Sequence, residues 1–442
     1  MDAKEWLTSE QTISKSKKGY AHFDRRTDMS EQWQYVADPE KVTHHAFFPF
    51  IHYQQEMVKF QKGVGRKPKI RDICYAAHVD SCIFQYYSYQ LNLLYNERVE
   101  KDGINHVAVA YRIGLGGSNI TFSKQALEFI RKNAPCYVMI GDFTGFFDNL
   151  DHQYLKRQWC SLLGEQFLSK DHYVVFKNVT QYSKWERADL LTLNGFPDTK
   201  GGIRRLNAKP TVLTKEQYIA NRSHIVKNPN PFGIPQGSPI SAVLANVYML
   251  ETDKQVNEMV RVCNGLYMRY SDDFIVVIPE RHGVDVPKEL EKVVAKIKDT
   301  PNLELQPNKT QYFYYSGQKL ENCGEQFSAE ADCSKRFINF LGFTFDGEKA
   351  SIRAKTTGKY YYRMRRKARS ITKQGGYTAG GKHISGRKLY ESYSEKGSKS
   401  GKGNFLTYVN RAAKVFGEDE AIRRDTARHM QKIRKVLKEH KA

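Results

Sequence analysis

The chain has 442 residues, of which 40% are hydrophobic and 27% charged, and its 70 Lys and Arg outweigh 48 Asp and Glu. This length supports two or three lobes with sizeable cores, and the net charge of +22 favours a phosphate-rich partner such as nucleic acid. No apolar run reaches the ~18 residues that span a bilayer. The seven cysteines contain no Cys-x-x-Cys pair, and charged residues follow Met1 closely. We therefore expect a cytoplasmic protein without a membrane span, a zinc site or disulfides.

The clearest helix predictions come from apolar stripes at helical spacing. One stripe predicts a helix from His78 to Val99, and another predicts a helix from Lys288 to Asp299. Both stripes are typical of faces that pack into a core. Because strand-like runs alternate with these helices, the sequence indicates a mixed α+β fold.

A carboxylate stands at the end of a predicted buried strand. The apolar run from Cys136 to Ile140 is followed by Gly141 and Asp142. An Asp in this place can be held rigidly enough to bind a catalytic metal ion. The alternative is that Asp142 only caps the helix that follows.

A loop rich in Gly and Pro lies further along, between Pro231 and Ser241, and a helix is predicted after it over residues 242–250. Glycine permits close backbone approach and proline stiffens the chain. The loop could therefore press against a base pair or sugar, and a plain turn before a helix is the alternative.

Two adjacent aspartates form the most informative feature. The apolar runs 265–269 and 274–278 flank Asp272 and Asp273, which predicts a hairpin with both carboxylates at its tip. Like charges this close repel, and a divalent cation relieves that cost. Oxygen ligands without Cys or His favour Mg²⁺, with Mn²⁺ as the alternative. Together with Asp142 they would hold two ions for phosphoryl transfer; an ordinary acidic turn is the bland alternative.

The C-terminal part carries most of the charge. Residues 351–442 contain 25 Lys or Arg and 7 Asp or Glu, a net charge of +18, so the first 350 residues carry only +4. From Gly358 to Lys373 tyrosines alternate with cations, which suits nucleic acid. We expect binding through Tyr360, Tyr362, Arg363, Arg365 and Arg366. Residues 374–404 predict a mobile basic linker, and Ala421 to Lys438 predict a helix.

In their order along the chain, these elements resemble the motifs of reverse transcriptases. Asp142 with Phe146-Phe147-Asp148 resembles motif A, Gly233 to Gly237 resembles motif B, and Tyr270 to Asp273 resembles motif C. Motifs D and E are resembled by Leu303 to Thr310 and by Phe340 to Phe345. The resemblance covers roughly residues 40–350 and part of the C-terminal tail. It implies a right-hand polymerase of the α+β class, with fingers and palm built from an antiparallel sheet plus helices and with a basic α-helical thumb.

The resemblance also implies roles for single residues. The metal ligands would be Asp142, Asp272, Asp273 and the backbone carbonyl of Phe143. Lys309 would be a catalytic proton donor to pyrophosphate, and Phe147 would be a steric gate against a 2′-hydroxyl. The nucleotide-binding set is Arg71, Arg112, Phe147, Gln236 and Gly237, and the primer grip is Phe340, Leu341 and Gly342.

The expected domains follow from the same resemblance. They are an N-terminal extension (1–40), fingers (41–135, with part of 150–230), a palm with motifs A to E (136–350), and a helical thumb (351–442) that contains the linker 374–404.

Three further stretches resemble bacterial antiphage reverse transcriptases of the abortive-infection type: Gly19 to Asp24, His78 to Ile83, and Ser118 to Ile120. We therefore expect an RNA-directed DNA polymerase of antiphage defence that uses dNTPs and two Mg²⁺ ions. A noncoding RNA template and a DNA product would be its partners. Template-independent or protein-primed synthesis, a group II intron-like enzyme and a non-catalytic nucleic-acid scaffold stay open as alternatives, and so does a homo-oligomer.

Overall fold

The computed structural model describes residues 2–61, 65–328, 333–373, 376–378, 380–383, 385–399, 401 and 403–438. The chain forms two compact units, each assembled from three separate segments. The first unit comprises Met1–Gly114, Phe143–Val256 and Ala295–Glu304, and the second comprises Leu115–Asp142, Asn257–Val294 and Leu305–Ala442.

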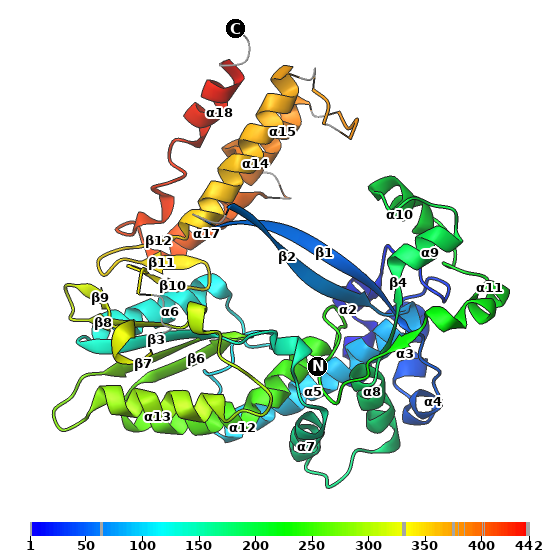
Figure 1. Ribbon diagram of the computed structural model, residues 1–442, viewed down its shortest axis with the longest axis horizontal. Helices are drawn as coiled ribbons and strands as arrows, with labels where there is room; N and C mark the ends of the chain where they lie inside the picture. Colours follow the sequence, from blue (N-terminus) through cyan, green and yellow to red (C-terminus); the bar gives the residue numbers. More distant parts are fainter. Residues whose placement is uncertain are drawn as a thin grey trace. The chain divides into compact units, whose positions relative to one another are not determined.

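The first unit holds a four-stranded sheet with the order β2-β1-β4-β5. Its strands are β1 (Phe50–Gln61), β2 (Gly65–Tyr75), β4 (Ser183–Glu186) and β5 (Val226–Lys227), and β1 and β2 form the long antiparallel hairpin of Figure 1. The helices around it are α1 (Ala3–Thr8), α2 (Glu10–Ser16), α3 (Met29–Val36), α4 (Pro39–Thr43), α5 (His78–Lys101), η1 (Phe146–Asp148), α7 (His152–Leu163), α8 (Lys170–Thr180), α9 (Arg187–Leu193), α10 (Lys200–Leu206), α11 (Lys215–Ala220) and η2 (Arg222–His224).

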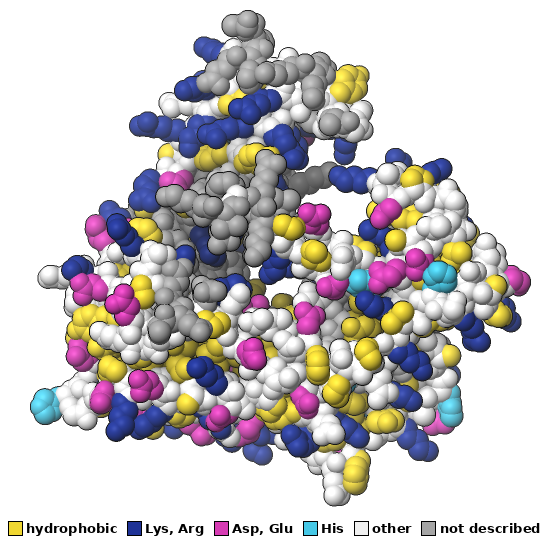
Figure 2. All heavy atoms as spheres, viewed as in Figure 1, with side chains coloured by type: hydrophobic (Ala, Val, Ile, Leu, Met, Phe, Trp, Pro, Cys, Tyr) yellow, Lys and Arg dark blue, Asp and Glu magenta, His cyan; other side chains and the backbone are white. Residues whose placement is uncertain are grey.

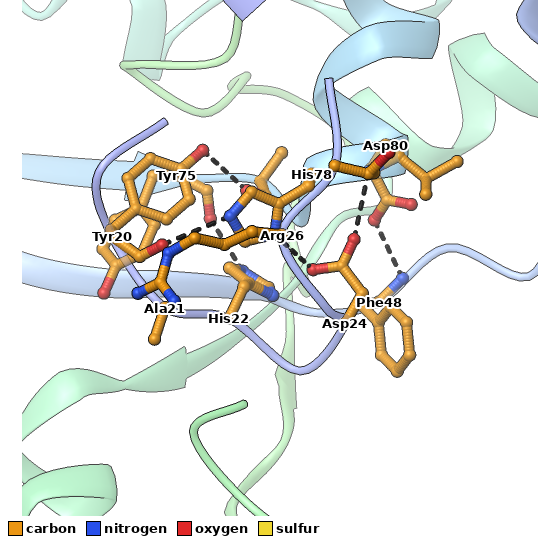
Figure 3. Close-up of polar contacts among 12 residues, drawn as sticks. Tyr20, Ala21, His22, Asp24, Arg26, Phe48, Tyr75, His78 and Asp80 are labelled. Carbon is orange, nitrogen blue, oxygen red and sulfur yellow. Dashed lines mark hydrogen bonds and ion pairs between the residues drawn. The ribbon is translucent and has the colours of Figure 1, made fainter. Parts of the chain in front are cut away.

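The segment around Tyr20 to Asp24 is tied to the start of α5 (Figure 3). Asp24 accepts hydrogen bonds from the His78 ring at 2.7 Å and from the Val79 amide at 3.0 Å, so it caps α5 from a distant part of the chain. Asp80, fully buried, accepts from the Phe48 amide. Two of the stretches that resemble antiphage enzymes therefore form one contact network.

The second unit is built on a five-stranded sheet with the order β6-β7-β3-β8-β9. Its strands are β3 (Cys136–Asp142), β6 (Leu266–Tyr270), β7 (Asp273–Pro279), β8 (Gln311–Tyr315) and β9 (Leu320–Asn322). A smaller sheet contains β10 (Ile338–Phe340), β11 (Phe343–Phe345) and β12 (Ala350–Ile352). Further elements are α6 (Asn119–Lys132), η3 (Pro307–Lys309) and η4 (Gly324–Gln326), while α12 (Ser241–Val262) and α13 (Val286–Lys298) run through both units.

The C-terminal part of the second unit is helical, as predicted. It contains α14 (Ala354–Lys373), α15 (Gly386–Tyr393), α16 (Glu395–Ser398), α17 (Phe405–Phe416), η5 (Ala421–Arg423) and α18 (His429–Lys438), and α14 and α18 lie side by side (Figure 1). Tyr360, Met364, Leu389, Leu406 and Ile433 share its core.

Two local predictions in this part were wrong. The range 374–404 was expected to be a linker, but its described residues include α15 and α16, because Leu389 and Tyr393 bury one face against α14. Residues 374, 375, 379, 384, 400 and 402 of that range, and residues 439–442 of the predicted thumb, lie outside the described residues. The helix expected from Ala421 to Lys438 is interrupted: η5 and α18 are separated by turns at residues 424–428.

The α+β class with antiparallel sheets and a C-terminal helical part is confirmed. The helices predicted from apolar stripes correspond to α5 and α13, and the predicted hairpin corresponds to β6 and β7. Among the described helices, none is both long enough and apolar enough to cross a membrane.

Candidate active site

The three predicted carboxylates meet at one edge of the five-stranded sheet. Asp142 is the last residue of β3, and in the register of the sheet it lies opposite Asp273, the first residue of β7. Tyr270 of β6 pairs with Asp273 from the other side. The turn between β6 and β7 therefore presents Asp272 beside the Asp142–Asp273 pair.

A buried arginine holds this turn. Ser271 has a left-handed backbone, with φ of 62°. Arg269 is completely buried, and its Nη1 donates a hydrogen bond to the Ser271 carbonyl oxygen at 2.9 Å. A charge-assisted bond of this kind fixes the backbone beneath the two aspartates.

Gly141 lets a neighbouring ring cross the strand just before Asp142. It pairs with Phe274 of β7, and a Cβ at Gly141 would lie 2.1 Å from the ring of Phe274. Any larger residue would have to move either the ring or β3. The glycine therefore fixes the approach of β7 at the position where Asp142 and Asp273 meet.

The electrostatics of the site reflect crowded negative charge. Although part of Asp273 reaches solvent, the protein around its carboxylate, together with Asp272 and Asp142, raises the pKa of Asp273 to about 7. Burial and the neighbouring Asp272 also raise the pKa of Asp142, against the opposing effect of Lys309. The Oδ1 atom of Asp142 is buried without a hydrogen-bond partner.

A divalent cation fits this donor set. It would relieve the repulsion among the carboxylates and satisfy the unpaired Oδ1 of Asp142. Among the described residues, no three His, Cys, Asp or Glu side chains are gathered closely enough to hold an ion by themselves. The Phe143 carbonyl as a further ligand stays a prediction.

Lys309 lies at the same edge. It ends the short helix η3, and its ammonium forms an ion pair with the Asp142 carboxylate. The Gln306 amide donates to the Asp142 carbonyl oxygen at 2.8 Å. The segment that resembles motif D is therefore anchored on the backbone and on the side chain of Asp142.

In the first unit, the Gly-Pro loop brings several predicted nucleotide contacts together. The Ile234 amide donates to the Phe147 carbonyl oxygen at 2.9 Å, and the Cys74 amide donates to the Gln236 carbonyl oxygen at 2.8 Å. Gly237 has a φ of 110°, and a Cβ there would lie 2.4 Å from the Cys74 carbonyl oxygen. Only glycine allows the loop to lie this close to β2, the strand that carries the exposed Arg71.

The prediction that Arg112 contacts triphosphate is not supported. Its guanidinium donates to the side chain of Asn96, to both the side chain and the carbonyl of Asn105, and to the Ala108 carbonyl. These bonds hold the loop that precedes α6. The arginine is therefore a structural brace, with most of its donors already used.

The predicted primer-grip residues form the turn between β10 and β11. Leu341 and Gly342 both have positive φ, of 48° and 91°, as a two-residue hairpin turn requires. The turn rests on α6, because Asn119 donates to the Leu341 carbonyl oxygen and Ser123 donates to that of Phe340. A contact of this turn with a primer stays a prediction.

The basic residues of α14 divide into an exposed face and a core. Tyr362, Arg363, Arg365 and Arg366 are exposed, and Figure 2 shows Lys and Arg side chains gathered over α14 and α18. Tyr360 was predicted to bind nucleic acid, but it is buried. It is 6% exposed, its hydroxyl donates to the Tyr393 carbonyl oxygen, and its ring packs in the core of the helical part.

Three residues of the site were missed from the sequence. Arg269 supports the β6–β7 turn, Asn119 supports the β10–β11 turn, and Arg353 lies close enough to Asp273 to lower its pKa. Arg269 could have been noticed as a charge between apolar strand residues. Asn119 lies in the stretch Ser118 to Ile120 that resembles antiphage enzymes, but its contact with Leu341 gave no local signal, and Arg353 gave none either, because their partners are far away in sequence.

Comparison with known families gives a match to part of the chain. Residues 199–345 match the family model described as reverse transcriptase (RNA-dependent DNA polymerase). The matched range contains Gln236, Gly237, Asp272, Asp273 and Lys309, together with the β10–β11 turn. No curated protein matches the chain.

Similar solved structures include three yeast telomerases, each 13% identical to this chain. One is apo telomerase from Candida tropicalis truncated from its C-terminal domain, with a TM-score of 0.40 over 74% of this chain and 60% of that chain. Another is telomerase from Candida albicans in complex with the TWJ fragment of telomeric RNA, with a TM-score of 0.38 over 93% and 68%. The third is apo telomerase from Candida tropicalis, with a TM-score of 0.38 over 95% and 75%.

The family match and the carboxylate edge agree on the chemistry. The matched family acts on nucleic acid, and the sheet edge supplies the acidic residues that nucleotidyl transfer requires. Both findings favour an enzyme over a non-catalytic scaffold. Residues 199–345 are similar to reverse transcriptases (RNA-dependent DNA polymerases).

Proposed function

We propose that the chain is a Mg²⁺-dependent reverse transcriptase of bacterial antiphage defence that copies an associated noncoding RNA into DNA. The observation that carries the catalytic part is the pairing of Asp142 with Asp273 in the sheet, with Asp272 in the adjoining turn. The defence role is supported by the resemblance of Gly19 to Asp24 and His78 to Ile83, two stretches that contact each other.

Each group of residues would have its own role in the reaction. Asp142, Asp272 and Asp273 would hold Mg²⁺, which activates a 3′-hydroxyl and neutralises charge on the leaving pyrophosphate when it is bound. Lys309 would give a proton to the leaving group, and the position of its ammonium beside Asp142 supports this role. Phe147, Gln236 and Gly237 would shape the nucleotide pocket.

The exposed cations of α14 are suited to the template. Arg363, Arg365 and Arg366 lie outside the core of the helical part, where phosphate oxygens could reach their guanidinium groups. None of the described elements resembles a sequence-specific DNA-binding element. Recognition of a structured RNA by its shape and phosphates is the simplest source of template choice.

The template is tested by purifying the protein from its host and sequencing both the copurified RNA and the DNA made from added dNTPs. We expect one dominant RNA, complementary to the DNA product. A homopolymeric or random product, especially one bonded to a Tyr or Ser of the protein, would favour template-independent or protein-primed synthesis instead.

The defence role has its own test. Cells that carry the wild-type gene should restrict phage growth, and cells that carry Asp272→Asn with Asp273→Asn should not. If both strains were equally sensitive to every phage tested, the antiphage assignment would be wrong while the polymerase assignment stood.

A further inference from the structure

Tyr111 has an unusual backbone that no hairpin turn explains. Among the described residues other than Gly and Asn, positive φ occurs at Tyr111 (61°), Ser271 (62°) and Leu341 (48°). Ser271 and Leu341 lie in the β6–β7 and β10–β11 turns, which require this conformation. A side chain with a Cβ makes the left-handed conformation costly, so its presence at Tyr111 calls for another cause.

Buried side chains hold the backbone on both sides of Tyr111. Asn92 of α5, which is 3% exposed, donates to the Tyr111 carbonyl oxygen at 2.7 Å and accepts from the Ile113 amide at 2.8 Å. Asn246 of α12 donates to the Ala110 carbonyl oxygen at 2.9 Å. Arg112 adds its bonds to Asn96 and Asn105. Each of the four residues 110–113 is therefore held by at least one hydrogen bond of its own.

These hydrogen bonds form a clamp around Tyr111. The ring of Tyr111 itself is not used for core packing. Tyr111 is 45% exposed, so burial of its ring does not account for a tyrosine in a position that favours glycine. The loop then continues through Gly114 and Gly116, where an added Cβ would meet open space. A flexible strand could approach both the ring and this backbone closely.

The clamp also links Tyr111 to the candidate nucleotide loop. Asn246 belongs to α12, the helix that begins at Ser241, directly after the loop that contains Gln236 and Gly237. The position of Tyr111 is thus set by the same helix that follows the nucleotide-contacting loop.

We propose that Tyr111 is a stacking platform for an unpaired base of the template strand, a positioning residue for polymerisation. An aromatic face accepts any base, which a polymerase needs because its template varies in sequence. A rigid backbone makes the platform ready before the strand arrives and lowers the ordering cost of binding. This inference rests on the proposed function, because it takes a nucleic-acid template as the ligand.

The test uses Tyr111→Phe, Tyr111→Ala and Tyr111→Gly in the full chain, with a fluorescein-labelled single-stranded RNA followed by anisotropy. Tyr111→Phe should bind within about twofold of wild type, since the ring is kept. Tyr111→Ala and Tyr111→Gly should bind roughly 5- to 150-fold more weakly. Tyr173→Ala, which removes a ring that is 43% exposed on α8, should bind as wild type does.

The variant Tyr111→Gly distinguishes a ring that binds RNA from a ring that stabilises the fold. Because it relieves the left-handed strain, Tyr111→Gly should melt at or above the wild-type temperature while binding RNA less well. A lower melting temperature in parallel with the lost affinity would mean that the ring is structural, and wild-type affinity in Tyr111→Gly would also overturn the proposal.

A primed RNA template that carries single abasic nucleotides locates the stacked base, because the primer end sets the register of the strand. The difference between wild type and Tyr111→Gly should vanish when one particular base is missing and persist when the others are missing. A difference that is the same at every position would contradict stacking on a defined base. Templated DNA synthesis by the wild-type preparation is measured alongside, so failure of the proposed function is told apart from failure of this inference.

Discussion

Asp142 and Asp273 lie directly opposite each other in the register of β3 and β7. Seven consecutive pairs, from Cys136–Pro279 to Asp142–Asp273, fix this register. A slip by one residue would turn one of the two carboxylates to the other face of the sheet. The juxtaposition of the two carboxylates therefore depends on the pairing of the whole strand as well as on the acidic residues.

The pH dependence of Mg²⁺ binding should follow Asp273. Its pKa is raised to about 7, so in the metal-free fold this carboxyl keeps its proton up to that pH, and a cation must displace the proton to bind. Mg²⁺ affinity should rise by up to about tenfold per pH unit below pH 7 and level off above it. Calorimetric titration from pH 5.5 to 8.5 measures this, and Asp273→Asn should flatten the rise. A wild-type affinity that did not change with pH would refute the assignment.

Removing the Phe147 ring should weaken discrimination against ribonucleotides. The residue is half-buried, and its ring lies 5.6 Å from that of Phe146. If it blocks a 2′-hydroxyl, Phe147→Ala should raise rNTP incorporation relative to dNTP by about tenfold or more, which is roughly 1.4 kcal/mol of lost discrimination. Single-nucleotide extension rates give the ratio, and Phe167→Ala, at a 72% exposed site, is the control. An unchanged ratio in a folded variant would leave Phe147 as a packing residue only.

A methyl group at Gly237 should displace the nucleotide loop. The added Cβ would lie 2.4 Å from the Cys74 carbonyl oxygen, so the loop would have to move away from β2 and strain the Cys74–Gln236 hydrogen bond. We expect Gly237→Ala to lower kcat/KM by roughly a hundredfold, as misplacement by about 1 Å does. Gly386→Ala is the control, because nothing lies within 4 Å of a Cβ there. Equal kcat/KM in both variants would show that the loop does not position the nucleotide.

Neutralising the exposed face of α14 should weaken nucleic-acid binding and its dependence on salt. The triple variant Lys359→Gln, Arg363→Gln, Arg366→Gln removes three exposed cations. Each lost phosphate contact should reduce the slope of log Kd against log salt by about 0.7 to 0.9. The control removes three exposed lysines of α13 by Lys288→Gln, Lys292→Gln, Lys298→Gln. The same slope in both triple variants would show that α14 is not a special contact surface.

The structural features that depend on residues adjacent in sequence were predicted best. The strand before Asp142 and the hairpin around Asp272 and Asp273 have local signals, namely an apolar run and a flanked polar pair, and both formed as expected. The resemblance to reverse transcriptases implies a triphosphate contact for Arg112, and the alternation of tyrosines with cations predicts a nucleic-acid contact for Tyr360. Their actual partners, Asn105 and Tyr393, follow from tertiary packing that no local pattern reveals.

The same limit applies to the helical part. The low helix preference of a Gly- and Ser-rich segment predicted a linker, yet Leu389 and Tyr393 gain enough burial against α14 to form α15. Burial of a few apolar side chains outweighed composition there.

RNA-templated DNA synthesis by the Asp272→Asn, Asp273→Asn variant shows whether these two carboxylates are needed for polymerisation. With a primed RNA of defined sequence, dNTPs and Mg²⁺, wild type should extend the primer with the complementary sequence. The double variant should lose about a thousandfold or more of this rate while its affinity for the primed RNA stays within about twofold, because the carboxylates act on the transition state through the metal. Extension by the variant at a rate near that of wild type, or no templated extension by wild type, would contradict the account.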